Sequence, residues 1–160
     1  TAKEKGKLVH VHVDQFNTDE ETETEQLARK TIEHGMQGKV SAVHSISVAA
    51  HPKKYRMELY DLIKEANMHI ISCPTAWVDH NRTERLAPSH NSMTPVDEMV
   101  PAGITVAFGT DNINDIYKPF SDGDLWTELR VMLEACHYYD VEQLANIATI
   151  NGLKVLGIEK

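Results

Sequence analysis

Four short runs rich in β-branched residues alternate with helical segments, and this alternation constrains the fold more than any other feature. The runs that predict strands are residues 8–13, 39–44, 69–73 and 103–109. The segments that predict helices are residues 20–34, 53–67, 95–101, 125–138 and 141–150. Strands separated by helical crossovers pair in parallel. We therefore expect a single α/β unit over residues 1–160, built on a parallel sheet.

Local signals place the ends of the first helix. Thr18 or Asp19 can cap it ahead of Glu20, because their side-chain oxygens accept hydrogen bonds from the free N–H groups of a first turn. Gly35 ends the same helix. The long polar stretch 77–93 has no clear helix or strand pattern, which predicts a functional loop or a lid.

Composition excludes several classes of protein. The 160 residues carry a formal net charge of −8, which argues against a nucleic-acid surface. No apolar run reaches the length of a membrane helix, and no signal-peptide pattern opens the chain. Two cysteines fit a reducing compartment, so we expect a cytoplasmic protein. The chain begins at Thr1 without an initiator Met, which indicates a piece of something longer.

Polar residues gather where the predicted strands end. His12 lies at the end of the first strand and Gln15 comes just after it. His44 ends the second strand, and Asp111 follows the fourth. A histidine at a strand end is often structural, and an Asp after a strand is often a helix cap. However, the carboxyl ends of parallel strands meet at one edge, where α/β barrels carry their active sites. Imidazole and carboxylate together suit zinc or ferrous iron, so we expect one divalent metal there.

The strand sequences also resemble a known family. The similar segments are residues 11–15, 40–44, 104–112 and 148–158. Together they resemble the amidohydrolase superfamily and, within it, the cytosine deaminase branch. The resemblance implies a (β/α)₈ barrel of the TIM type, of which this chain covers strands five to eight and their helices. Residues 1–160 are then the C-terminal half of a metal-dependent hydrolase.

The resemblance also implies roles for individual residues. His12 and Asp111 bind the metal, and Asp111 accepts a proton from the attacking water. His44 holds or polarises that water or the substrate atom under attack. Asn112 and the loop through Asp115 and Tyr117 face the substrate, which is a small heterocycle.

The implied reaction is hydrolytic deamination of a cytosine-like pyrimidine or an aminotriazine, with release of ammonia. The deaminase branch usually has a proton-shuttling glutamate where this chain has Gln15. A primary amide cannot gain or lose a proton near neutral pH, although it can form hydrogen bonds. Either another group, His44 or Asp111, handles both proton transfers, or the substrate is not cytosine. Hydrolysis of an N-alkylaminotriazine or a cyclic amide is therefore the alternative reaction.

Two further alternatives stay open. His10 and His12 match the His-x-His pair that opens such barrels on strand one, but too few strands lie between them and Asp111. His10 is then a residue that fills the barrel interior. The chain alone supplies two metal ligands, so we expect either a homo-oligomer or association with a missing N-terminal half. A half-barrel without enzyme activity that associates through its sheet edges is the remaining possibility.

Overall fold

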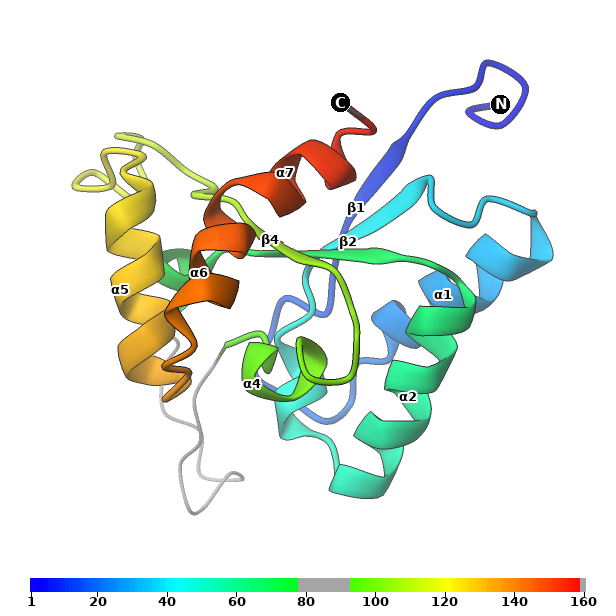
Figure 1. The fold of residues 1–160 in the computed structure, drawn as a ribbon, viewed down its shortest axis with the longest axis horizontal. Coiled ribbons are helices and arrows are strands. Elements are labelled where there is room, and N and C mark those ends of the chain that lie inside the picture. The colour runs from blue at the N-terminus through cyan, green and yellow to red at the C-terminus, as the bar shows by residue number, and fades with distance from the viewer. Residues whose placement is uncertain (78–92, 159–160) are drawn as a thin grey trace.

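The computed structural model describes residues 1–77 and 93–158 (Figure 1). Four parallel strands form one sheet in the order β1-β2-β3-β4. The strands are β1 (Val9–Val13), β2 (Val40–His44), β3 (His69–Ser72) and β4 (Val106–Phe108). The predicted stretch 77–93 lies almost wholly outside the described residues and stays a prediction.

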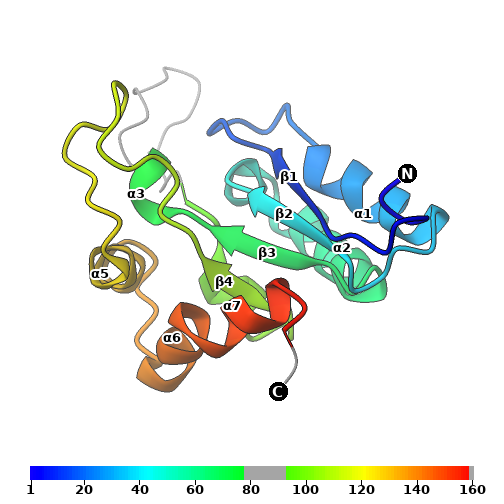
Figure 2. The same ribbon diagram turned by 90° about the horizontal axis from the view of Figure 1, so that it is seen from above.

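Helical segments follow every strand, as the alternation predicts. They are α1 (Glu23–Glu33), the 3₁₀ helix η1 (Ser47–Ala50), α2 (Lys53–Glu65), α3 (Pro74–Trp77), α4 (Val96–Met99), α5 (Leu125–Ala135), α6 (Val141–Ala148) and α7 (Ile150–Val155). Figure 2 shows β1 and β4 at the two edges of the sheet, with α1 and α2 beside β1 and β2, and α6 and α7 beside β4.

Alternation along the strands gives the sheet two different faces. One face packs in the main core with the helices and includes Val13, Ala42, Ile70 and Val106. The side chains on the other face also stand in register, because His12 pairs with Val43 and Val43 pairs with Ile71. Val43 and Ile71 pack with Cys73 in a separate small cluster. We call this side of the sheet the second face.

The first helix is capped from a distance, so the predicted cap is wrong. Helix α1 begins at Glu23, not at Glu20. The carboxylate of Asp14, which directly follows β1, accepts from the backbone N of Glu23 at 2.7 Å and of Thr24 at 3.1 Å. The Glu23 carboxylate in turn accepts from the backbone N of Asp14 at 2.9 Å. This reciprocal pair locks the end of β1 onto the start of α1.

An ion pair joins α2 to α4. Arg56 donates from Nε and Nη2 to the two carboxylate oxygens of Glu98, at 2.7 and 2.6 Å. The Tyr60 hydroxyl donates to the same carboxylate at 2.7 Å. The Arg56 hydrogen bonds lower the pKa of Glu98, and the hydrogen bond from Tyr60 lowers it further. A bidentate pair of this kind is among the stronger ionic contacts.

The last predicted helix, residues 141–150, is α6 and ends at Ala148, and a further helix, α7, which was not predicted, follows it. The backbone breaks at Thr149, with φ −134° and ψ −86°, between α6 and α7. The turn lets the Asn151 side chain of α7 donate to the carbonyl oxygen of Val106 in β4 at 2.8 Å. None of the described helices has the length and apolar character that crossing a membrane requires.

Candidate metal and catalytic site

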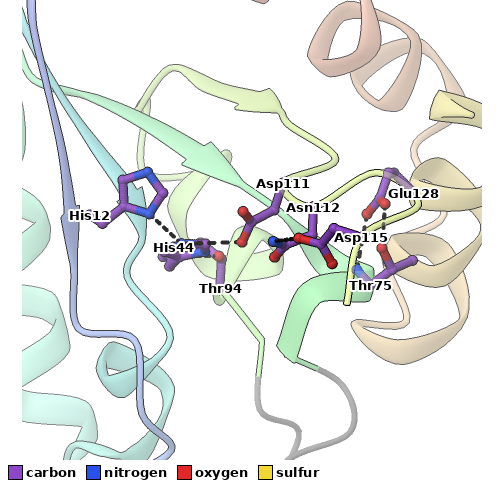
Figure 3. A network of polar contacts seen from close by, with 8 residues as sticks. All are labelled: His12, His44, Thr75, Thr94, Asp111, Asn112, Asp115 and Glu128. Atoms are coloured by element: carbon purple, nitrogen blue, oxygen red, sulfur yellow. Dashed lines mark hydrogen bonds and ion pairs between the residues drawn. The ribbon is translucent and has the colours of Figure 1, made fainter. Parts of the chain in front are cut away.

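Two histidines meet at the carboxyl ends of β1 and β2. Nδ1 of His12 lies 2.9 Å from Nε2 of His44, with the rings edge to face (Figure 3). Simple alternation would put His44 on the core face with Ala42. The backbone at His44 is instead left-handed, with φ 79°, where β2 ends. Its imidazole therefore reaches His12 on the second face.

Asp111 completes the group from the far edge of the sheet. Its Oδ2 lies 3.7 Å from Nε2 of His44, and its side chain is 22% exposed. Asp111 follows β4 and also has a left-handed backbone, with φ 58°. The three predicted residues His12, His44 and Asp111 thus form one line of contacts across the sheet edge (Figure 3).

Burial controls the charge of His44. Its side chain is fully buried, and burial lowers its pKa to about 4. Asp111 opposes this shift, whereas His12 adds to it. Thr94 fixes the backbone here, since its hydroxyl donates to the carbonyl oxygen of His44. The imidazole of His44 is therefore neutral near pH 7, with one ring nitrogen that can accept a hydrogen bond and one that can donate.

The other predicted residues divide into two groups. Gln15 lies after β1, partly buried and next to Asp14. Asn112 donates to the carboxylate of Asp115, which also accepts from the backbone N of Tyr117 at 2.9 Å. Asp115 thus organises the loop after β4, while Tyr117 lines a hollow of about 390 Å³. That Asn112, Asp115 and Tyr117 face the substrate stays a prediction.

A buried carboxylate that was not predicted from the sequence also lines this hollow. Glu128 of α5 is 2% exposed and accepts from the backbone N of Thr75 at 3.0 Å and from the Thr75 hydroxyl. Burial raises the pKa of Glu128. The contact joins α5 to the start of α3, directly after β3. The sequence offers no signal for this contact, because an acidic residue near a helix start is ordinarily solvated.

The donor chemistry fits a divalent metal. Imidazole nitrogen and carboxylate oxygen are the ligands of catalytic zinc and of non-haem iron. However, a catalytic zinc normally has three protein ligands, and His12 and Asp111 supply two. Among the described residues, the group of three whose ligand atoms lie within 4.8 Å of one another is Asp14, Glu21 and Glu23. Asp14 and Glu23 of this group already form the reciprocal hydrogen bonds at the start of α1.

The amidohydrolase family matches residues 1–160 of this sequence. The chain belongs to the amidohydrolase family. The family is metal-dependent, and the four-stranded sheet described above is part of a TIM-type barrel. The sequence prediction of fold class and family is therefore confirmed.

Individual relatives agree with this assignment. The chain is 29% identical over 162 residues to N-isopropylammelide isopropyl amidohydrolase of Pseudomonas sp. (strain ADP), covering 99% of this chain and 37% of the relative. An uncharacterized protein of Haemophilus influenzae is 56% identical over 100 residues, or 62% of this chain and 36% of that protein. The chain thus spans just over a third of the length of these relatives.

A solved structure gives the same result in three dimensions. The crystal structure of 5-methylcytosine deaminase from Klebsiella pneumoniae, liganded with 5-fluorocytosine, superposes with a TM-score of 0.89 at 29% identity. The match covers 98% of this chain and 39% of that chain. The fold of this chain therefore occurs as part of the longer chain of that deaminase.

Proposed function

We propose that this chain takes part in hydrolytic deamination of a small nitrogen heterocycle, a cytosine-like pyrimidine or an aminotriazine, with release of ammonia. The observation that carries the proposal is the junction of His12, His44 and Asp111 at one sheet edge. Metal-assisted hydrolysis needs ligands for the ion and a group that takes the proton of the attacking water. These three residues offer both.

Two similar proteins support a ring substrate. One is the 5-methylcytosine deaminase whose crystal structure holds 5-fluorocytosine. The other is N-isopropylammelide isopropyl amidohydrolase. Each covers nearly the whole of this chain at 29% identity. We also propose that the four strands are the last four of an eight-stranded barrel.

His12 and Asp111 are the proposed ligands of one divalent metal, zinc or iron. When bound, such an ion lowers the pKa of a water molecule toward neutrality and so supplies a nucleophile near pH 7. Asp111 is open to solvent on one side, so its carboxylate can take the proton of that water. The carboxylate thus serves both as ligand and as general base.

His44 is proposed to position the attacking water or the ring atom under attack. Because its imidazole is neutral near pH 7, one ring nitrogen can accept a hydrogen bond and the other can donate one. Its Nε2 lies between His12 and Asp111, where it can hold the attacking water or the ring atom under attack.

Gln15 favours a second candidate reaction. Its amide can hold a ring by hydrogen bonds, but it cannot carry a proton to a ring nitrogen. An N-alkylaminotriazine or a cyclic amide presents a different set of hydrogen-bonding groups from cytosine, and a site that recognises a ring by hydrogen bonds discriminates strongly between such sets. The similarity to N-isopropylammelide isopropyl amidohydrolase supports this alternative.

A screen of ring amines tests the proposal. The chain is supplied with zinc or iron, and ammonia or alkylamine release is measured over aminopyrimidines, aminotriazines and an N-alkylaminotriazine. We expect release from at least one ring, and a loss of 100-fold or more in Asp111→Asn. Asp61→Asn, on the exposed surface of α2, is the matched control. Release from no ring, or equal rates in both variants, contradicts the proposal.

A further inference from the structure

We propose that Glu128 is a positioning residue for Asp111. It holds the turn that follows β3, and this turn holds the segment that leads from β4 to Asp111. The inference rests on the proposed role of Asp111 as metal ligand and general base. It adds a residue of α5 to the site, one that acts through Thr75 and takes no part in the chemistry itself.

The contact between Glu128 and Thr75 is a costly way to begin a helix. Burying a carboxylate is unfavourable unless hydrogen bonds replace those of water. Thr75 supplies two, from its backbone N at 3.0 Å and from its hydroxyl. A Ser or Asp just before α3 could accept from a backbone N–H of its first turn more simply, but Cys73 stands there. The long-range bond instead fixes the position of the turn relative to α5.

The turn after β3 packs closely against the segment that follows β4. The backbone N of Gly109 donates to the carbonyl oxygen of Ser72 at 2.8 Å, one step beyond the last pair of the two strands. A Cβ atom at Gly109 would lie 3.1 Å from Cγ2 of Ile71 and 3.2 Å from Sγ of Cys73. Glycine allows this close approach. Asp111 follows two residues later, so a displaced turn would displace Asp111.

Glu128 also lies near Asp111 in space. Thr75 and Glu128 line the hollow of about 390 Å³ together with Thr110, the residue just before Asp111. Burial raises the pKa of Glu128, and the charge of Asp111 raises it further. Figure 3 shows Glu128 and Thr75 beside the loop that begins at Asp111. The positioning contact is thus adjacent to the loop whose start it holds.

Four variants of the purified protein separate positioning from other roles. Glu128→Ala removes both hydrogen bonds. Glu128→Gln keeps them without the charge, because its amide oxygen can accept from the backbone N of Thr75 and its NH₂ can donate to the hydroxyl oxygen. Glu134→Ala removes an exposed carboxylate of the same helix and is the first control. Ile63→Val lowers stability through the core beneath α2 and is the second.

Three measurements are made on each variant: zinc affinity by competition with a chelator, hydrogen exchange of the Gly109 amide, and urea unfolding. In Glu128→Ala we expect zinc affinity to fall about tenfold and the Gly109 amide to exchange faster. Glu128→Gln and Glu134→Ala should match the parent in both. Ile63→Val should unfold at lower urea and keep its zinc affinity.

Three results would overturn the positioning role. Unchanged zinc affinity and exchange in Glu128→Ala would show that Asp111 does not depend on Glu128. An equal loss of zinc affinity in Ile63→Val would show that general stability is responsible. A loss in Glu128→Gln as large as in Glu128→Ala would show that the charge matters and not the hydrogen bonds.

The partner residue provides an independent check. Thr75→Val removes the hydroxyl that donates to Glu128 and leaves the backbone N–H. We expect a smaller loss of zinc affinity than in Glu128→Ala, and no further loss when the two changes are combined, because both act through one contact. Losses that add in the double variant contradict the proposal.

These readouts distinguish this inference from the proposed function. If the parent binds no zinc, the proposed metal site fails, and exchange of the Gly109 amide still tests whether Glu128 holds the segment. If the parent binds zinc and releases amine from a ring, and Glu128→Ala does both equally well, the deamination stands and the positioning role fails.

Discussion

At the residue scale, burial gives His44 its chemical character. The ring is fully buried, yet it touches an exposed histidine on one side and a partly exposed carboxylate on the other. A protonated ring would lose more solvation there than Asp111 could restore, which is why its pKa falls. The site thus combines a neutral, oriented imidazole with a carboxylate open to solvent.

We predict that the His44 ring titrates near pH 4 in the metal-free chain. An unfolded histidine titrates near 6.5, so the unfolded state binds more protons between pH 4 and 6.5. The His44 contribution to the free energy of unfolding is therefore present above pH 6.5 and is lost as pH falls toward 4. NMR titration of the ring resonances, assigned with His44→Gln, measures this. Titration of His44 at pH 6 or above contradicts the prediction.

Gln15 allows a test of substrate preference. Gln15→Glu adds a group that can exchange protons, at a position partly buried beside Asp14. If the missing shuttle alone limits the chain, ammonia release from cytosine-like rings should rise by at least about tenfold, as expected for an added general acid or base. Gln15→Met, similar in size, should give no gain. No gain with Glu on any aminopyrimidine would mean that the pocket accepts another ring.

At the element scale, contacts between distant segments hold the site edge in place. The Asp14 carboxylate ties β1 to α1, two residues from His12. We predict that Asp14→Ala lowers the free energy of unfolding by about 1–2 kcal/mol, as expected for loss of a helix cap. Thr22→Ala is the control, because Thr22 stands at the N-cap position without a side-chain cap bond. Urea denaturation of both variants measures the difference, and equal effects would show that Asp14 is not the cap.

The pair between Arg56 and Glu98 predicts a pH-dependent stability. Because the folded pKa of Glu98 is lowered, its stabilisation is present above the unfolded value of about 4.3 and is lost as pH falls through the folded pKa. Glu98→Gln should therefore lower the free energy of unfolding by about 1–2 kcal/mol at pH 7 and by much less at pH 3. The exposed Asp61→Asn should change stability by under about 0.5 kcal/mol. Denaturant unfolding curves at both pH values measure these changes. A loss of unfolding free energy that does not vary with pH would contradict the prediction.

Local patterns predict these elements well and their long-range contacts poorly. The four strands follow from periodicity, and observed strand ends differ from prediction by three residues at most. The α1 cap was wrong because Asp14 lies nine residues before Glu23, outside any local capping pattern. Helix α7 was not predicted, and the bond of its Asn151 side chain to β4 is a tertiary contact that local patterns do not reveal.

At the scale of the whole molecule, parallel topology explains why the site residues could be named from the sequence. His12, His44 and Asp111 end separate strands, and parallel pairing brings those ends together. The neutral state of His44 and the contact between Thr75 and Glu128 could not be predicted in this way. Both depend on burial by segments far away in the sequence.

The metal content of the purified chain shows whether His12 and Asp111 hold an ion. Elemental analysis compares the parent chain with Asp111→Asn and His12→Gln after equal exposure to zinc and iron. Asp61→Asn, on the exposed surface of α2, is the control. The account predicts bound metal in the parent and the control, and a loss of most of it in both site variants. A chain without metal, or site variants that bind as much as the parent, would contradict a metal site at His12 and Asp111.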